Sequence, residues 1–477
     1  MFDPPYPSGL PIGEGWVEAP TSFMVRFPYD GSPVAAAPTG DIDLAYRALD
    51  AAAAVAEQVA ALSSHARRSA LRRASEDVAA RREEFEQLLV LETGKPLVDC
   101  RVEVARTIVT LEASAEEVGR LHGETVPLDL LPSGEGLIGY WTRRPVGPVV
   151  GITGFNYPLL LAAHKIAPAI AAGCPVIAKP APQTPLATLW LAHLLRSSDA
   201  LPPAAVQVVT GGAEVGEALV TDSRIGAVSF TGSAAVGHEI ARAAAPKKVL
   251  LELGANSALV VAADADLAAA ADAVVRGGYY ASGQACISVQ RVLVEAPARD
   301  EFLHLLVRRV EEIVVGDPRS PDTRVAPLID SAATERVRGW LADAIETGAT
   351  LVTGGVFEGA ALRPTVLADV RDGLHAWDEE IFGPVVCVRT VADLDDAIAT
   401  ANRSRYGLHA SVFSRSLATA FAAIERLHVG GVVVNEVPGF RADTMPYGGV
   451  KDSGIGREGP RFAIEELTTT RMAIIRP

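Results

Sequence analysis

The feature that most limits the fold of this chain is a run of alternating strand-like and helix-like segments between residues 147 and 254. Short apolar runs such as "GPVVGIT" and "PVIAKP" predict strands, and longer segments such as "PLLLAAHKIAPAIAAG" predict helices. Five strands separated by four helices predict a parallel, doubly wound sheet. The strands are continuous apolar runs because helices cover both faces of such a sheet. Ligands bind at the carboxyl ends of its strands.

The segments on either side of residues 147–254 have different sequence patterns. Residues 41–121 have the periodicity of three helices, the second over 67–95 and the third beginning near Pro96. From about 255 to 445 the strand–helix pattern restarts, which predicts a second α/β domain. "GLIGYWTRRP" and the final "TRMAIIRP" predict strands that belong to neither sheet. The last strand needs a pairing partner, which a second subunit could supply.

Charge and cysteine content exclude several function classes. The net charge of −15 argues against a nucleic-acid partner. The four cysteines form no CxxC pair, so neither a metal site nor a disulfide framework is expected. The first residues lack the pattern of a signal peptide. The apolar run 159–178 contains His164, Lys165 and two prolines, so it predicts a buried helix and strand and not a membrane span. We therefore expect a cytoplasmic protein.

Three residues are candidates for covalent chemistry. Cys286 lies in "SGQACISVQ" among small and polar neighbours, which suits a reactive thiol better than a structural one. Glu252 ends the apolar strand of "LLELGANS", where a carboxylate is costly to bury unless it is used or paired. Asn156, in the turn of "TGFNYPLL", could donate to an oxyanion. Taken singly, each could instead be structural: a packed thiol, a local pair and a helix cap.

Nucleotide binding has weaker signals. The segment 147–254 contains no GxGxxG motif. In "FTGSAAVG", Gly232 and Ser233 end a strand and begin a helix, whose N-terminus could bind pyrophosphate. Lys179 follows another strand and could reach ribose hydroxyls or a phosphate. A helix cap and a surface lysine are the alternatives.

Taken together, these segments resemble the aldehyde dehydrogenase superfamily. Its motifs are matched, in the superfamily's order, by "GFNYPL", "KPAPQTP", "FTGS", "LELGANS", "SGQACIS", "EEIFGP" and "MPYGGVKDSGIGRE". The resemblance covers nearly the whole chain. It implies an α/β fold in which 1–122 and 147–254 form a Rossmann-like cofactor domain, 255–446 form a catalytic α/β domain, and 123–146 with 459–477 form a β oligomerisation flap. A homodimer or homotetramer is expected.

The resemblance also implies residue roles. Cys286 would be the nucleophile, Glu252 the general base, and Asn156 the oxyanion donor together with the Cys286 N–H. NAD or NADP would be held by a larger set, comprising Thr153, Lys179, Gly212, Gly216, Phe230, Gly232, Ser233, Glu380 and Phe382. Lys179 would bind the adenine ribose, Gly232 and Ser233 the pyrophosphate, and the last two the nicotinamide end. The thiolate would add to an aldehyde, hydride transfer would leave a thioester, and water would release the acid.

Two departures bear on these roles. Many NAD-dependent members have Glu in "KPAEQTP". This chain has Pro182 at that position, so the sequence is compatible with NADP as well as with NAD. The usual "ELGGK" is "ELGAN" here, with Ala255 and Asn256, but Glu252 is retained and activity is expected to survive.

The substrate is the least defined feature. The motifs resemble the branch of lactaldehyde, phosphonate-aldehyde and non-phosphorylating glyceraldehyde phosphate dehydrogenases. The expected contacts are Arg106, Tyr157, His164, Arg441 and Tyr447. Ala285 takes the place of the phosphate-binding arginine that immediately precedes the cysteine in the last of these enzymes. We therefore expect a small polar aldehyde as the substrate, and one form of this hypothesis gives it an anionic group. The alternatives are a CoA-acylating dehydrogenase, or a non-catalytic binding protein on the same scaffold.

Overall fold

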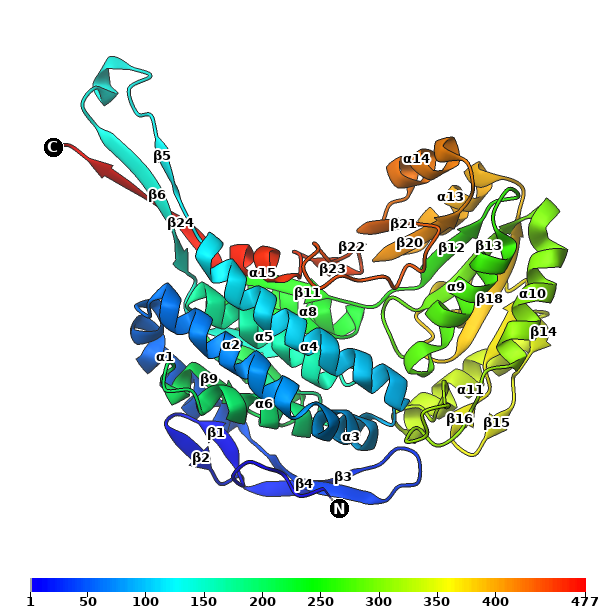
Figure 1. Ribbon diagram of the computed structural model, residues 1–477, viewed down its shortest axis with the longest axis horizontal. Helices are drawn as coiled ribbons and strands as arrows, with labels where there is room; N and C mark the ends of the chain where they lie inside the picture. The colour runs from blue at the N-terminus through cyan, green and yellow to red at the C-terminus, as the bar shows by residue number, and fades with distance from the viewer. Residues whose placement is uncertain (1) are drawn as a thin grey trace.

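The computed structural model describes residues 2–477 and contains two large β-sheets. In Figure 1 the first sheet and its helices form the left and lower part of the molecule, and the second sheet forms the right part. A third, small sheet projects from the body at the upper left. The α/β fold expected from the sequence, with two largely parallel sheets and a separate flap of strands, is confirmed.

The first sheet has six strands in the order β9, β8, β7, β10, β11 and β23. Their bounds are β7 (Val149–Ile152), β8 (Val176–Lys179), β9 (Val206–Val208), β10 (Ala227–Thr231), β11 (Lys248–Glu252) and β23 (Gly454–Ile455). The first five run parallel and are the five strands predicted between residues 147 and 254. The order of these strands reverses between β7 and β10, which is where such sheets form dinucleotide sites.

Four helices alternate with these strands, as predicted: α5 (Pro158–Ala172), α6 (Leu186–Arg196), α7 (Ala213–Thr221) and α8 (Ala234–Ala244). Every residue of α5 is buried. Three helices from other parts of the chain also pack on α5, namely α2 (Ser64–Ala80), α4 (Leu97–Glu117) and α15 (Pro460–Glu466). The apolar run 159–178 is therefore a buried helix and strand. Among residues 2–477, no helix combines the length and the apolar character needed to span a membrane.

The N-terminal part contains two short hairpins and four helices. Their bounds are β1 (Leu10–Ile12), β2 (Gly15–Val17), β3 (Thr21–Arg26), β4 (Pro33–Thr39), α1 (Ile42–Ala60), α2 (Ser64–Ala80), α3 (Arg82–Thr93) and α4 (Leu97–Glu117). The continuous helix predicted over 67–95 is wrong, because the chain breaks at Arg81, where φ is −111° and ψ is 24°. The Arg81 guanidinium turns back to donate to the carbonyl of Asp77 at 3.1 Å. This contact supplies a donor for a carbonyl at the helix end.

The second sheet has seven strands in the order β14, β17, β18, β13, β12, β20 and β21. Their bounds are β12 (Ser257–Val261), β13 (Val289–Glu295), β14 (Thr350–Thr353), β17 (Thr365–Ala368), β18 (Val385–Val391), β20 (His409–Phe413) and β21 (Gly431–Val434). The helices around it are α9 (Leu267–Tyr279), α10 (Arg299–Glu311), α11 (Ser331–Glu346), α12 (His375–Asp378), α13 (Leu394–Asn402) and α14 (Leu417–Arg426). The two-residue strands are β15 (Phe357–Glu358), β16 (Ala361–Leu362), β19 (Tyr406–Gly407) and β22 (Val450–Lys451). Separate clusters of buried apolar side chains pack within each of the two sheet units.

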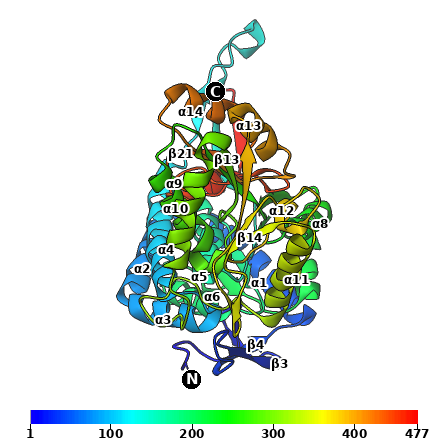
Figure 2. The same ribbon diagram turned by 90° about the vertical axis from the view of Figure 1, so that its right-hand side faces the viewer.

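The flap consists of β5 (Glu124–Val126), β6 (Ile138–Pro145) and β24 (Thr468–Ile475). The final strand pairs antiparallel with β6 along its whole length, and Figure 2 shows the flap projecting above the body. The segment 459–477, expected as strand, begins instead with helix α15 (Pro460–Glu466). This helix packs on α4 and α5, and the strand starts only at Thr468.

The chain returns to the first sheet after it has built the second. Strand β23 pairs antiparallel with β11, and Gly454 lies opposite Glu252. The segment 446–458 therefore runs along the junction between the two sheets. It brings Tyr447 and Glu458 next to residues of the first sheet and of the second.

Candidate active site

Cys286 lies in a tightly bent loop between α9 and β13. The backbone before it takes three successive left-handed conformations, with φ of 48° at Ala281, 57° at Ser282 and 73° at Gly283. Such conformations persist only where the surroundings fix them. The buried Asp99 carboxylate accepts a hydrogen bond from the Ala281 N–H at 2.9 Å, and the Ser282 hydroxyl accepts one from a neighbouring loop at 2.9 Å. The small and polar residues before the cysteine therefore shape its loop.

The thiol of Cys286 faces a cavity and touches one hydroxyl. Its Sγ lies 3.3 Å from the Oη of Tyr447. Burial raises the pKa of the thiol to about 12, and the nearby carboxylates of Glu380 and Glu252 also raise it, whereas the Tyr447 hydrogen bond and Arg441 lower it. The thiol is therefore protonated at neutral pH. Its reaction as a nucleophile needs a group that takes the proton.

Asn156 sits in the turn between β7 and α5. Its Nδ2 donates to the carbonyl of Gln284 at 2.8 Å, which holds the amide against the loop that carries Cys286. The Cys286 N–H has no backbone acceptor within residues 2–477. Behind Asn156, the N-terminus of α5 is fixed by Glu103, which accepts a hydrogen bond from the Leu159 N–H at 2.9 Å. An amide and a backbone N–H thus lie near the thiol, where both could donate to an oxyanion.

Glu252 ends β11 and is almost fully buried, with 4% of its surface exposed. Its Oε2 has no hydrogen-bond partner in the described chain. Burial and the neighbouring Glu458 raise the pKa of Glu252 well above its usual range, against the opposing effect of Lys165 and Arg441. A carboxyl group with a raised pKa is suited to exchange protons near neutral pH.

A charged cluster surrounds Glu458 beside this carboxyl. Glu458 forms an ion pair with the buried Lys165 and accepts a hydrogen bond from Arg441 at 3.1 Å. His164 lies next to it, with Nδ1 3.3 Å from Glu458 Oε2. Burial opposes ionisation of Glu458, but Lys165, His164 and Arg441 outweigh it and hold the pKa well below the usual value. The same surroundings therefore favour the ionised form of Glu458 and the neutral form of Glu252.

Asp443 extends the cluster from His164 to Arg106. It binds Arg106 through two hydrogen bonds, of 2.7 and 3.1 Å, and lies 3.5 Å from His164 Nε2. Burial raises the pKa of Asp443, but His164 and Arg106 more than reverse this effect, so its pKa is below the usual range. Arg106 and Arg441, both expected as substrate contacts, therefore each have a carboxylate partner.

A cavity of about 780 Å³ lies between the two sheet units. It brings together most of the predicted site residues: Arg106, Asn156, Tyr157, His164, Gly232, Ser233, Glu252, Cys286, Glu380, Phe382, Arg441 and Tyr447. The other predicted residues, Thr153, Lys179, Gly212, Gly216 and Phe230, are outside its lining. They belong to the strand ends and helix starts of the first sheet.

The residues at these strand ends fit a dinucleotide. Thr153 follows β7, and its buried Oγ1 has no hydrogen-bond partner among the described residues. Lys179 ends β8, is 6% exposed and forms no ion pair within residues 2–477. Ser233 begins α8 and accepts a hydrogen bond from the Val236 N–H at 3.4 Å. An unpartnered hydroxyl, a buried cation and the start of an 11-residue helix match the ribose and pyrophosphate of NAD(P).

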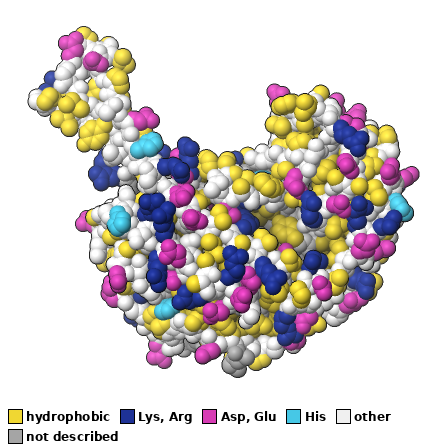
Figure 3. Space-filling view, in the orientation of Figure 1, with side chains coloured by type: hydrophobic (Ala, Val, Ile, Leu, Met, Phe, Trp, Pro, Cys, Tyr) yellow, Lys and Arg dark blue, Asp and Glu magenta, His cyan; other side chains and the backbone are white. Residues whose placement is uncertain are grey.

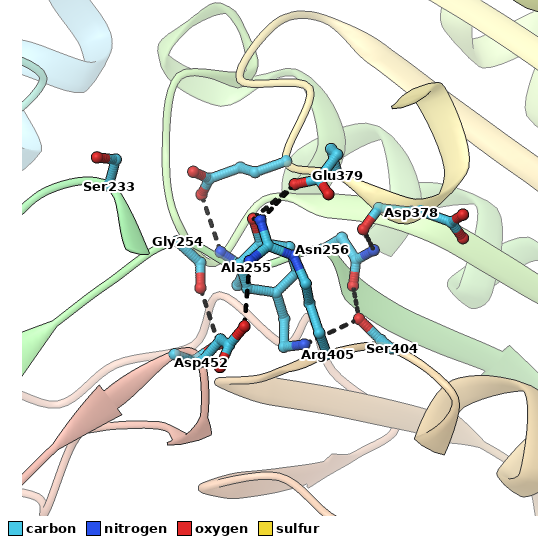
Figure 4. A network of polar contacts seen from close by, with 12 residues as sticks. Ser233, Gly254, Ala255, Asn256, Asp378, Glu379, Ser404, Arg405 and Asp452 are labelled. Atoms are coloured by element: carbon cyan, nitrogen blue, oxygen red, sulfur yellow. Dashed lines mark hydrogen bonds and ion pairs between the residues drawn. The ribbon is translucent and has the colours of Figure 1, made fainter. Parts of the chain in front are cut away.

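Asn256, the residue in place of the family's lysine, fixes the segment that carries Glu380. Its amide donates to the carbonyl of Asp378 at 3.1 Å, and its Oδ1 accepts from the Ser404 hydroxyl at 2.6 Å, as Figure 4 shows. Glu380 accepts a hydrogen bond from the Ala255 N–H at 3.1 Å. Burial raises the pKa of Glu380 to about 7, although the Ala255 N–H lowers it.

Several charged side chains that hold this site have little or no signal in the sequence pattern. Arg405 binds Glu379 at 2.6 Å and Asp452 at 3.1 Å, which ties the Glu380 segment to the junction between the sheets (Figure 4). Glu458 ends the quoted motif "MPYGGVKDSGIGRE", and Asp443 lies two residues before it, so their closeness to Arg441 in the sequence is a usable clue. Arg405 offers no such clue, because its partners are distant in sequence.

Residues 16–473 match the aldehyde dehydrogenase family, so the chain belongs to this family of NAD(P)-dependent oxidoreductases. One relative is 3-sulfolactaldehyde dehydrogenase from Priestia aryabhattai, 39% identical over 468 residues that cover 98% of each chain. The structure of aldehyde dehydrogenase 21 from Physcomitrella patens, in complex with the reaction product succinate, is 37% identical with a TM-score of 0.94, covering 98% of this chain and 97% of that one. The structure of glyceraldehyde-3-phosphate dehydrogenase GapN from Methanocaldococcus jannaschii DSM 2661, complexed with NADP, is 34% identical with a TM-score of 0.92, covering 96% and 100%. The superfamily and the activity class expected from the motifs are thereby confirmed.

Proposed function

We propose that this enzyme oxidises a short aldehyde with an anionic group at its far end, and releases the corresponding acid by hydrolysis of a cysteine thioester. The observation that carries this proposal is the charge balance of the buried cluster. Lys165, Arg106 and Arg441 supply three positive charges, while Asp443 and Glu458 supply two negative ones. When Glu252 is in the neutral form that its surroundings favour, these five side chains leave one positive charge, which an anionic substrate would balance.

Arg441 is the best placed contact for that anion. Its side chain is 7% exposed, its Nε has no hydrogen-bond partner in the described chain, and it lines the cavity. The guanidinium lies 3.7 Å from the ring centre of Tyr447, whose hydroxyl touches the Cys286 thiol. A short substrate bound at Cys286 would therefore place its far end near this arginine. Arg106, 23% exposed, would lie farther out, next to Asp443.

Tyr157, His164 and Tyr447 would form the remaining polar wall of the substrate site. All three line the cavity. Lys95 lies 3.6 Å from the ring centre of Tyr157 and fixes that ring from behind. The relatives support an anionic substrate: one is named for an aldehyde that carries a sulfonate, and another has the dicarboxylate succinate as its reaction product.

Each residue role follows from the geometry as part of the same proposal. Cys286 would pass its proton to the ionised form of Glu252, which lines the same cavity, and add to the aldehyde carbon, forming a thiohemiacetal whose oxyanion accepts hydrogen bonds from Asn156 and the Cys286 N–H. The bound dinucleotide supplies a hydride acceptor. Thr153, Lys179, Gly212, Gly216, Phe230, Gly232, Ser233, Glu380 and Phe382 would hold it. Glu252 would take a proton from the water that attacks the thioester.

A buried Glu252 beside the thiol supports hydrolysis over transfer to CoA. A catalytic role also accounts for a carboxyl whose Oε2 is buried without a partner, which a purely structural protein would have no reason to keep. If CoA were the acceptor, Glu252→Gln would not slow turnover. If the protein only bound ligands, no aldehyde would reduce either cofactor.

The test is a comparison of charged and neutral aldehydes. Arg106→Ala and Arg441→Ala are assayed with short aldehydes that end in a carboxylate, a sulfonate or a methyl group, with NAD+ and NADP+ in parallel. We expect kcat/KM for the anionic aldehydes to fall about 100-fold, with KM rising, because a charge-assisted contact contributes up to about 3 kcal/mol. The neutral aldehyde serves as the internal control. Equal losses for charged and neutral aldehydes would contradict the assignment.

We also propose that the protein is a homodimer or homotetramer formed through the flap. The flap exposes Leu130, Leu131, Ile138 and Ile474, and Figure 3 shows apolar side chains gathered on it. A second apolar face lies on α14, where Leu417 and Phe421 are 76% and 66% exposed. Such patches usually mark interfaces. Light scattering after size-exclusion chromatography tests this, and Ile474→Asp should lower the mass of the assembly.

The cytoplasm is the compartment we propose. All four cysteines are free thiols, including Cys286, and a thiol nucleophile needs a reducing environment. Cell fractionation with antibody detection tests the assignment.

A further inference from the structure

One corner of the cofactor-binding edge lacks the acidic residue that NAD sites use. In dinucleotide-binding sheets, an Asp or Glu near the end of the second strand accepts hydrogen bonds from the adenine ribose hydroxyls. Here the second strand, β8, ends at Lys179, and Pro182 occupies the place of the family's glutamate. The corner therefore contains a buried cation from this strand but no carboxylate from it.

A carboxylate enters the same corner from the next strand. Glu214 stands in the first turn of α7, directly after β9. Its side chain folds back over the start of its own helix, where Oε1 accepts a hydrogen bond from the Gly212 N–H at 3.2 Å. Both carboxylate oxygens lie in the space that a Cβ at Gly212 would enter. This position holds the charge at the edge of the sheet.

The two charged side chains lie along the same helix, α7. A Cβ placed on Gly216, in the middle of α7, would lie 3.6 Å from Lys179 Cε, so the lysine stem runs along the helix that bears Glu214. Burial lowers the pKa of Lys179, and Glu214 opposes this effect. The Lys179 ammonium and the Glu214 carboxylate are not within ion-pair distance of each other. Lys179 is therefore free to bind a ligand, and Glu214 supplies a negative charge near the same ligand.

We propose that Glu214 replaces the missing carboxylate of β8, accepts hydrogen bonds from the ribose hydroxyls of NAD+, and repels the 2′-phosphate of NADP+, so that NAD+ is the preferred cofactor. A phosphate that carries close to two negative charges would meet Lys179 and Glu214 together. At a separation of a few ångströms in water, the carboxylate weakens its binding by about tenfold. This inference rests on the NAD(P) dependence of the family and on the proposed placement of the ribose at Lys179. It does not rest on the proposed aldehyde.

The experiment measures cofactor binding without aldehyde. Dissociation constants of NAD+ and NADP+ are determined by calorimetry for the wild type, Glu214→Gln and Glu217→Gln. Glu217 is an exposed glutamate of the same helix, but Glu214 is the carboxylate that acts on the pKa of Lys179. Glu217→Gln has the same net charge as Glu214→Gln and serves as the matched control. Because Glu214 is also exposed, neither substitution should disturb folding.

We expect the wild type to bind NAD+ more tightly than NADP+. Glu214→Gln should bind NADP+ about tenfold more tightly and NAD+ a few-fold more weakly, while Glu217→Gln should match the wild type. Adding Pro182→Glu to Glu214→Gln should restore the preference for NAD+. A wild type that prefers NADP+, or an equal ratio of the two constants in both single variants, would overturn the proposal. Loss of activity toward anionic aldehydes would refute the proposed substrate but leave this result unaffected.

Discussion

Replacing Gly283 by Ala is expected to displace the loop that carries Cys286. The φ of 73° at Gly283 costs an alanine about 1–2 kcal/mol. Its Cβ would press on the carbonyl oxygen of Gly383 and lie 2.8 Å from Pro384 N, closer than side chains approach backbone atoms. Overpacking of this kind costs about 1–3 kcal/mol more, because backbone atoms cannot swing aside. The free energy of unfolding should therefore fall by about 2–5 kcal/mol.

A matched control separates the clash from the backbone conformation. Gly359 has a φ of 62° and no atom within 4 Å of an added Cβ, so Gly359→Ala should lose only about 1–2 kcal/mol. Urea unfolding compares the two variants. Hydrolysis of p-nitrophenyl acetate, which needs the thiol but no cofactor, reports the placement of Cys286. Equal destabilisation of both variants, with full ester hydrolysis in Gly283→Ala, would refute the argument.

Three further predictions concern the chemistry. Glu252→Gln should slow acid release about 100-fold or more. Stopped-flow absorbance should then show a burst of about one reduced cofactor per subunit. Undiminished steady turnover would remove Glu252 from the mechanism. Because burial and Glu458 raise the pKa of Glu252, its base form is present only above that raised pKa, so acid release should rise with pH at a higher pH than an ordinary glutamate would give. Glu458→Gln removes a neighbouring negative charge and should shift the rising limb of the pH profile to lower pH. Asn156→Ala should lower kcat/KM about 100- to 1000-fold while the Kd for the cofactor, measured by fluorescence quenching, stays constant.

The parts of the fold that the sequence predicts are those with local causes. The five strands from β7 to β11 are mostly apolar because both faces of a parallel sheet are buried. The break at Arg81 has no such signal, because neither Gly nor Pro marks it and a side-chain contact to Asp77 accompanies it. Helix α15, which precedes the last strand, is also missing from the prediction, because the resemblance to the family implies only strands in this segment.

The site residues likewise divide into those that a motif predicts and those that no local pattern predicts. Cys286, Glu252 and Asn156 carry motif signals, and the structure brings all three to one cavity. The contact between Arg106 and Asp443 joins residues 337 positions apart, and no local pattern encodes such a pairing. The carboxylate of Glu214 is hidden for a related reason, since its importance depends on where Lys179 of a different strand points.

The pairing of β11 with β23 has a topological consequence. Because Glu252 lies opposite Gly454, residues 253–453 leave the first sheet from one strand and return to it on the adjacent strand. The second sheet unit is thus an insertion into a β-hairpin and is joined to the first by a double-stranded stem. Glu252 belongs to the stem, whereas Cys286 belongs to the insertion. The separation of base and nucleophile therefore depends on how the insertion is set against the stem, and contacts such as that of Asn156 with the Gln284 carbonyl fix this arrangement.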